Sequence, residues 1–388
     1  MGNAVIPRRK GGNYATVEFE SYEIPTLIKR EAEDASYHGS YFAATAVGNY
    51  ALFGGGYKTT TVDAYDINLT HTIPASLNIG RGSLEATAGQ NYALFAGGSQ
   101  VIDNSTVYYS AVDVYSTTLT HTTTSLSENK TYLSAATVGN YSLFAGGNVE
   151  GVGSTDTVEV YDNNLVHSMA PNLSKKGGPQ AATLNNHAIF ARKTISDVYS
   201  ANLTLTTIEG VTSSMSPNAA ASNENYALFG SMHSYTIDVY NSSLVRLTPI
   251  SLSDSGSELV ATTVGPFALF AIISFYADDS SSSVVEGFDN NLVSHQFEPL
   301  TEGRYITPAT TLGKYALFGG GLKPNGGVSR KVDCYEYTSK DLELTLYKGT
   351  KYKFQGMDAE ATVEADIEPK TIATPTTGYI KLKKVTLS

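Results

Sequence analysis

A short apolar element, Tyr-Ala-Leu-Phe, returns throughout most of this 388-residue chain. Its first copy lies at residues 50–53 and is followed by three glycines. Further copies, some with one or two replacements, begin at Tyr92, Tyr141, His187, Tyr226, Phe267 and Tyr315. The copies recur about every 40 to 50 residues, a period typical of units with four β-strands rather than of helical pairs. We therefore expect an all-β chain that contains seven such units.

Side-chain size predicts where each strand of a unit lies. The first strand carries small residues, as at 43–45 (Ala-Ala-Thr), which fit where several sheets converge on a central channel. The second strand, Tyr-Ala-Leu-Phe, is apolar on both faces, as in a strand buried between neighbouring sheets. The third strand reads apolar-acidic-x-aromatic, as at 62–65 (Val-Asp-Ala-Tyr). This order predicts a seven-bladed β-propeller over residues 41–344, with about four strands in each blade.

The two ends of the chain fall outside the repeats. Residues 1–40 form a polar arm, and their segment 23–27 (Glu-Ile-Pro-Thr-Leu) resembles the end of later repeats. We expect this segment to supply the outer strand of the last blade and so close the ring. The alternative is that residues 342–347 supply this strand and that the amino terminus is an external arm. Residues 345–388 break the repeat and are interpreted as a small C-terminal β appendage, being short and poor in aromatic residues for a carbohydrate module.

The connections divide between the two rims of the expected disc. Turns between the first and second strands, and between the third and fourth, are short and rich in Gly and Asn, as at 163–164, where Asn is expected to take a positive φ. The opposite rim, called the long-loop rim, carries connections of variable length. Its loops between the second and third strands are longest in the second, third, sixth and seventh repeats. Because loops on a rigid scaffold commonly carry function, a ligand is expected at this rim.

Charge and cysteine content exclude several functions. The net charge is −11 and the Lys and Arg residues are scattered, so nucleic acid is not expected as a partner. Cys334 is the single cysteine, which allows no internal disulfide. It occupies a third-strand position that other repeats fill with Ala or Val, so it is expected to be a packed apolar residue. No signal peptide or membrane-spanning run is found, and the chain is expected to be made in the cytoplasm without membrane insertion.

Repeated polar residues are candidates for chemistry or for structure. His71, His121 and His167 resemble metal ligands, but they recur at one position of three successive units and so lie too far apart to share an ion. The acidic residue of the third strand recurs in every unit, whereas a catalytic acid and base differ in environment. Both sets are interpreted as structural. Loop acids such as Asp103 and Asp278 lack a full set of Ca²⁺ ligands. We therefore expect no enzyme, no metal site and no cofactor.

Aromatic side chains on the long-loop rim are candidates for ligand binding. They are Tyr108, Tyr109, Tyr276 and Tyr305, with Arg304 beside them. Aromatic faces next to hydrogen-bonding groups are typical of sugar recognition. The alternative is that these side chains only pack the loops against one another.

The repeat resembles that of the kelch family of β-propellers. The resemblance covers about residues 41–344 and rests on paired glycines after the second strand and on Val-Asp-x-Tyr in the third. It departs in one respect, since the fourth-strand Trp of kelch repeats is replaced by His71, His121, His167 or unrelated residues. Copper oxidases of the galactose oxidase kind share such blades, but the third-strand position of Cys334 does not suit their Cys–Tyr cofactor.

The sequence pattern Ala-Thr-x-Val-Gly-Asn-Tyr-Ala-Leu-Phe resembles that of kelch-like proteins encoded by phages and prophages of gut Firmicutes. Those proteins tend to be virion or tail proteins. The resemblance implies a host-attachment adhesin of the phage tail that binds a bacterial cell-surface glycan or protein. It also implies contacts of residues 1–40 and 345–388 with other virion proteins. The alternative is a structural virion component that binds other virion proteins and no ligand, and a homo-oligomer stays open in both cases.

Overall fold

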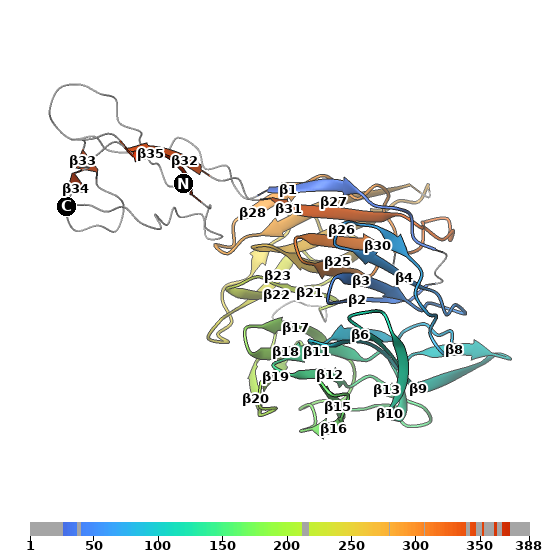
Figure 1. Ribbon diagram of the computed structural model, residues 1–388. Coiled ribbons are helices and arrows are strands. Elements are labelled where there is room, and N and C mark those ends of the chain that lie inside the picture. The colour runs from blue at the N-terminus through green and yellow to red at the C-terminus, as the bar shows by residue number, and fades with distance from the viewer. Residues whose placement is uncertain are drawn as a thin grey trace. The chain divides into compact units, whose positions relative to one another are not determined.

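The computed structural model describes residues 26–36, 40–211, 217–278, 280–305 and 307–338, together with the backbone of further strands between residues 342 and 372 (Figure 1). The elements of these residues are strands. None of the described residues forms a helix long and apolar enough to cross a membrane. The chain divides into two compact units, one of Lys29–Glu336 and one that combines Met1–Ile28 with Tyr337–Ser388.

The unit of Lys29–Glu336 is a propeller-like arrangement of antiparallel sheets, and six of the sheets are four-stranded (Figure 1). Five of these use the strands of one repeat in chain order, and in the third repeat the hairpin β13–β14 between them belongs to another sheet. The first repeat supplies β2 (Ala43–Val47), β3 (Tyr50–Gly54), β4 (Val62–Asp66) and β5 (His71–Thr72). The third supplies β11 (Ser134–Val138), β12 (Tyr141–Ala145), β15 (Val158–Asp162) and β16 (His167–Ala170).

The next three repeats follow the same order. The fourth supplies β17 (Gln180–Leu184), β18 (His187–Ala191), β19 (Ile195–Ser200) and β20 (Leu205–Glu209). The fifth supplies β21 (Ala219–Ser222), β22 (Tyr226–Gly230), β23 (Thr236–Asn241) and β24 (Ile250–Ser251). The sixth supplies β25 (Glu258–Val264), β26 (Phe267–Phe275), β27 (Ser281–Phe288) and β28 (Ser294–Phe297).

The sheet of the second repeat differs, because it has seven strands. Its path runs through β6 (Glu85–Ala88), β7 (Tyr92–Ala96), β9 (Ser105–Ser116) and β10 (His121–Thr131) to β13 (Asn148–Val149) and β14 (Gly153–Ser154), and β8 (Ser99–Ile102) pairs with β9. The last residues of the long strand β10, Lys130 and Thr131, pair with the hairpin of the third repeat. The expectation of a four-stranded sheet in all seven repeats is therefore met in six sheets and wrong in this one.

The remaining four-stranded sheet joins the two ends of the repeat region. It has the order β1-β31-β30-β29, from β1 (Thr26–Glu31), β31 (Val332–Thr338), β30 (Tyr315–Gly319) and β29 (Ala309–Leu312). The outer position belongs to the amino-terminal strand, while residues 23–25 of the expected segment lie outside the described residues. The alternative closure is wrong, because β32 (Leu342–Leu346) pairs with β35 (Ile367–Ile372), and β33 (Lys351–Tyr352) pairs with β34 (Ala361–Thr362).

Small residues line the centre, as expected from the first strands. These strands contact one another in a closed series, in the order β2, β6, β11, β17, β21, β25, β29 and back to β2. Their Ala, Thr and Ser residues surround a central channel of about 400 Å³. Larger side chains would fill this space, which explains the composition of the first strand.

Close approach between sheets explains the glycine after Tyr-Ala-Leu-Phe. Phe53 of β3 and Phe95 of β7 are fully buried, and each ring lies against the preceding sheet. A Cβ at Gly319 would lie 2.6 Å from the Phe53 ring, and a Cβ at Gly54 would lie 2.9 Å from the Phe95 ring. Glycine is therefore required here by space.

Third-strand residues bind the connection that precedes their own sheet. The buried Glu159 accepts hydrogen bonds from the backbone N–H and the hydroxyl of Ser127, at 3.0 and 2.6 Å. Asp333 accepts the same pair from Thr301. The aromatic position adds a hydroxyl that donates to a backbone carbonyl at Tyr65, Tyr115, Tyr161, Tyr199, Tyr240 and Tyr335. These contacts confirm that the repeated acids are structural.

One turn prediction is wrong. In the turn after β15, the positive φ of 61° belongs to Leu165 and not to Asn163 or Asn164. The Asp162 carboxylate accepts hydrogen bonds from the backbone of Asn164 and Val166, at 2.8 and 2.9 Å, and fixes the turn in this form. A leucine takes the same conformation at Leu69, Leu119, Leu203, Leu244 and Leu292.

Candidate functional site

The long loops of the predicted binding rim are ordered hairpins. Residues 99–110 form β8 and the start of β9, and this hairpin projects beyond its neighbours in Figure 1. Tyr108 and Tyr109 are half-buried on β9, where the Tyr109 hydroxyl lies 3.3 Å from Oε1 of Gln100. Because the two tyrosines are consecutive in a strand, they point to opposite faces of the hairpin.

Tyr276 and Tyr305 lie in a different part of the rim. The Tyr305 ring stacks on Phe275, with centroids 3.6 Å apart, and Tyr276 is 53% exposed at the turn between β26 and β27. Because Tyr305 bonds to Leu322 of the last repeat, the sheet of the first repeat lies between this pair and the β8–β9 hairpin in the ring order. The predicted site residues thus form two separate groups rather than one site.

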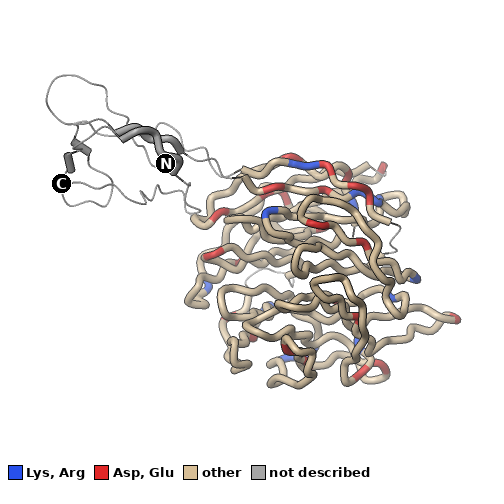
Figure 2. Tube along the Cα trace, in the orientation of Figure 1, with Lys and Arg blue, Asp and Glu red and all other residues tan. Residues whose placement is uncertain are grey.

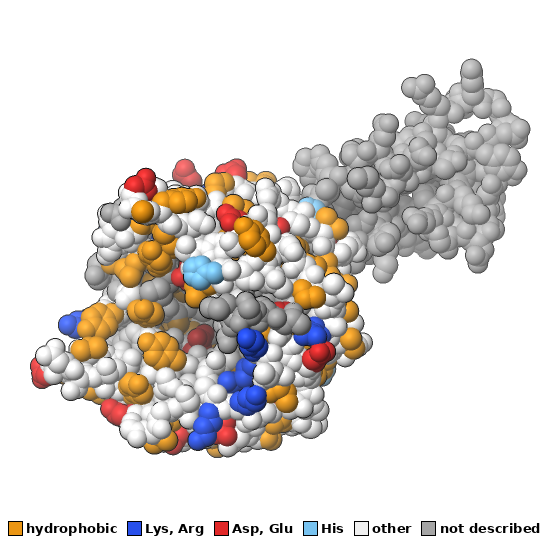
Figure 3. All heavy atoms as spheres, turned by 180° about the vertical axis from the view of Figure 1, so that it is seen from behind, with side chains coloured by type: hydrophobic (Ala, Val, Ile, Leu, Met, Phe, Trp, Pro, Cys, Tyr) orange, Lys and Arg blue, Asp and Glu red, His pale blue; other side chains and the backbone are white. Residues whose placement is uncertain are grey.

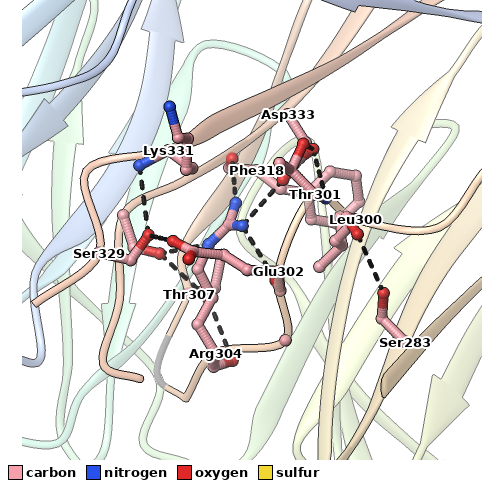
Figure 4. Close-up of polar contacts among 12 residues, drawn as sticks. Ser283, Leu300, Thr301, Glu302, Arg304, Thr307, Phe318, Ser329, Lys331 and Asp333 are labelled. Atoms are coloured by element: carbon pink, nitrogen blue, oxygen red, sulfur yellow. Dashed lines mark hydrogen bonds and ion pairs between the residues drawn. The ribbon is translucent and has the colours of Figure 1, made fainter. Parts of the chain in front are cut away.

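Arg304 is buried, so its predicted contact with a ligand is wrong. Its side chain has 0% exposure and donates to the carbonyls of Gly320, Glu302 and Phe318 (Figure 4). Its guanidinium also lies 2.8 Å from the Asp333 carboxylate.

The same arrangement recurs elsewhere, which identifies the Arg304 network as structural. Arg81 is equally buried and pairs with Asp113 at 2.8 Å, and Lys130 pairs with Glu159 at 2.5 Å. Arg81, Lys130 and Arg304 each follow a leucine at the same spacing in their repeats. This recurrence in the sequence indicates a structural role for Arg304, just as recurrence in every unit indicates a structural role for the third-strand acids.

The three histidines are also structural. His71, His121 and His167 each place Nε2 at 2.6 to 2.8 Å from the third-strand acid of their own sheet. Their rings pack on the third-strand tyrosines, with centroids 4.8 to 5.0 Å apart. Among the described residues, no group of three His, Cys, Asp or Glu side chains is placed to hold a metal ion. Cys334 is fully buried, and burial raises the pKa of its thiol to about 12.

A cavity at the mouth of the channel was missed by the sequence analysis. It has a volume of about 560 Å³ and lies where the fourth strands connect to the first strands of the next repeats. Tyr41, Ser83 and Tyr132 line it at corresponding positions before β2, β6 and β11. We call this cavity the channel mouth.

Three residues of the channel mouth share a left-handed backbone. Their φ angles are 61° for Tyr41, 52° for Ser83 and 54° for Tyr132, a conformation that costs free energy for residues with a Cβ. The N–H of Ser83 donates to the carbonyl of Tyr41 at 2.9 Å, and the N–H of Tyr132 donates to the carbonyl of Ser83 at 3.2 Å. Tyr41 and Tyr132 remain 47% and 56% exposed. Strained backbone that presents exposed aromatic rings is typical of functional sites.

Polar groups enter the channel mouth from the first strands. Glu85, Ser134 and Gln180 line the cavity, and burial raises the pKa of Glu85 to about 7. The corresponding residues in other repeats include Ala43 and Ala219. Polar residues at positions where other repeats have alanine were the sequence signal for this site.

The space-filling view shows how the residue types are distributed on one face. Figure 3 shows a hollow with hydrophobic side chains around it and Lys and Arg side chains gathered to one side. A concave surface with aromatic rings and a few polar groups can bind a small polar ligand such as a sugar.

Comparison with known proteins identifies the fold. No protein-family model and no curated protein matches the chain. The solved structure reported as streptogramin B lyase has a TM-score of 0.56 at 12% identity, covering 81% of this chain and 98% of that chain. Virginiamycin B lyase from Staphylococcus aureus has a TM-score of 0.57 at 9% identity, covering 81% and 100%, and YjhT has 0.53 at 10%, covering 78% and 95%.

The comparison corrects the expectation that this protein is not an enzyme. Two of the similar structures are reported as lyases, so this fold does not support that expectation. At 9 to 12% identity the likeness shows the fold alone. The chain is an all-β protein with a propeller-like arrangement of sheets.

Proposed function

We propose that this protein is an adhesin that binds a bacterial cell-surface glycan at the channel mouth. The observation that carries the proposal is the pair Tyr41 and Tyr132. Both side chains are exposed, and both residues keep a left-handed backbone conformation that costs free energy. Aromatic rings stack on the apolar faces of sugars, and Glu85 and Gln180 supply hydrogen-bonding groups in the same cavity. The exposed Tyr276 and the half-buried Tyr108, Tyr109 and Tyr305 are secondary contacts for a long glycan in this proposal.

The proposal includes the architecture and the setting. We count the seven-stranded sheet as the seventh blade of a kelch-like propeller, since its β6 takes a place among the central strands. The placement in a phage tail or virion, with residues 1–40 and 345–388 contacting other virion proteins, rests on the sequence resemblance.

Glycan binding by variants of the purified protein tests the proposal. The chain is applied to an array of bacterial surface glycans, and affinity for the strongest ligand is measured for the wild type and for the double variant Tyr41→Ala, Tyr132→Ala. Two stacked rings contribute about 0.5–1.5 kcal/mol each, so we expect affinity to fall by about tenfold. The matched control is Tyr235→Ala, which removes a ring that is 54% exposed and lies outside both the cavity and the proposed secondary contacts.

The outcomes separate the candidates. An equal loss of affinity in the Tyr235 control, or no loss in the double variant, would place binding elsewhere on the molecule. No glycan binding by a folded protein that is present in phage particles would support the structural virion component. Absence from phage particles would remove the virion setting.

Catalysis on the bound ligand is a second candidate, favoured by Glu85. A general acid works best when its pKa lies near the working pH, and the pKa of Glu85 is about 7 inside the cavity. Incubation of the bound glycan with wild type and Glu85→Gln tests this function. Cleavage by the wild type alone would support it, and an unchanged glycan would exclude it.

A further inference from the structure

A basic surface lies on the long-loop rim of the fourth repeat. Lys175, Lys176, Arg192 and Lys193 belong to two connections of one sheet, the one before β17 and the one after β18. The three lysines are exposed and Arg192 is half-buried. We call these four residues the basic patch. Its cations lie close together in a chain whose net charge is −11.

Hydrogen bonds hold the two connections side by side. Arg192 donates from its guanidinium to the carbonyls of Lys176 and Gly177, at 3.0 and 2.6 Å. The ammonium of Lys175 donates to the hydroxyl of Thr194 at 2.7 Å. The lysines of both connections therefore lie on one surface that these hydrogen bonds hold together.

Lys175 and Lys176 of the patch are exposed rather than buried against an acid, whereas Arg192 of the patch interacts electrostatically with Asp197. In the second, third and seventh repeats the cation of this connection is buried in an ion pair with the third-strand acid, as Arg304 is with Asp333. In the fourth repeat the corresponding acid, Asp197, accepts hydrogen bonds from Ser174. Among the described residues, no ion pair involves Lys175 or Lys176. The cations of this connection are thus left facing solvent.

The patch is continuous with the channel mouth. Gly178, Pro179 and Gln180 line the cavity and follow directly after Gly177, whose carbonyl binds Arg192. Lys175 and Lys176 precede these lining residues in the same connection. A ligand chain that leaves the cavity over β17 would therefore pass close to both lysines.

We propose that the basic patch binds the acidic groups, carboxylate or phosphate, of a polysaccharide whose neutral sugars occupy the channel mouth. This inference rests on the proposed glycan-binding function and names its ligand class. The alternative polyanion, a nucleic acid, is disfavoured because long duplexes need an extended positive surface. Figure 2 shows acidic residues interspersed with basic ones along the trace of the ring.

The test measures binding of the full chain to defined polymers. The probes are polygalacturonate, which carries carboxylates, poly(glycerol phosphate), and neutral dextran, each at low and high NaCl concentration. The variant is Lys175→Gln, Lys176→Gln. The control is Lys58→Gln, Lys323→Gln, which removes the exposed Lys58 and the half-buried Lys323 from other connections of the same rim. Thermal melting verifies that both variants fold.

We expect the patch variant to bind at least one polyanion about fivefold more weakly, with a smaller salt dependence, and the control to bind within twofold of wild type. Equal affinity of the two variants would overturn the inference, as would preferential binding of duplex DNA. Binding of neutral glycans that is lost in Tyr41→Ala, Tyr132→Ala but unchanged in the patch variant would overturn the inference and support the proposed function. Failure of wild type to bind any glycan on the array would overturn both.

Discussion

The guanidinium of Arg304 lies 2.8 Å from the carboxylate of Asp333, and both side chains are buried. Burial opposes the charged form of Asp333, but the guanidinium together with hydrogen bonds from Thr301 and Lys29 outweighs it and holds the pKa of this carboxyl below its usual range. The pair joins the connection before β29 to the third strand of the same sheet. A residue that looks like a ligand contact in the sequence is therefore part of the framework that supports the rim.

Arg304→Ala is expected to lower the free energy of unfolding by about 3 kcal/mol, because removing one partner of a buried ion pair leaves an uncompensated charge. Urea denaturation measures this change. The control is Lys323→Ala, whose exposed pair with Glu302 contributes less than about 1 kcal/mol. Equal stability of the two variants would contradict a structural role for Arg304.

Tyr41 offers a test of backbone strain at the channel mouth. Tyr41→Gly and Tyr41→Ala both remove the ring, but only glycine takes a φ of 61° without steric cost. We expect the glycine variant to be more stable than the alanine variant by about 1 kcal/mol in thermal or urea unfolding. Both variants should lose the same affinity for the glycan. A more stable alanine variant would show that the left-handed conformation is not retained.

The outer strand β1 is expected to be essential for stability. Deleting residues 1–31 leaves the edge of β31 unpaired and removes Lys29, whose ammonium lies 2.9 Å from the Asp333 carboxylate. We expect a loss of several kcal/mol, of the order that an unclosed ring implies. Deleting residues 1–25 spares β1 and is the control. Equal melting temperatures for the two truncations would argue against closure by β1.

Glu85 is expected to make stability depend on pH. Burial raises its folded pKa to about 7, above the ordinary value of 4.5, so between these values the folded protein binds the proton more tightly than the unfolded chain. Stability from this group is present at low pH and is lost as pH rises from about 4.5 to 7. Glu85→Gln should reduce the change in unfolding free energy over this pH range by about 1–3 kcal/mol. Glu258, whose pKa burial also raises to about 7, keeps its contribution in that variant. An unchanged pH dependence of the unfolding free energy would show that the Glu85 carboxyl is solvated in the folded protein.

The architecture was readable from the sequence because it rests on repeated local patterns. Small residues in the first strand and an apolar second strand fix the order of strands in every sheet. The extension of β10 to the β13–β14 hairpin was not readable, since it depends on the pairing of Lys130 with Val149 across two repeats. The leucine turns were missed because propensity favours Asn, whereas the Asp162 side chain decides which residue takes the positive φ.

The candidate site was only partly readable. Tyr276 was recognised as an exposed ring, but Arg304 was misassigned because its position recurs in other repeats as Arg81 and Lys130. Tyr41 and Tyr132 were overlooked because they precede a first strand, a place that the repeat marks as central and apolar. Their exposure depends on a backbone conformation that no residue pattern specifies.

The pairing of β1 with β31 has a consequence for the order of events during synthesis. The ribosome makes β1 before the other described strands of the ring, while its partner β31 (Val332–Thr338) is the last of them. While the strands between them are synthesised, the nascent chain therefore carries an orphan strand, at the stage when unpaired strand edges most readily associate with the wrong chain. The three charged residues Lys29, Arg30 and Glu31 in this strand oppose such association until the ring can close.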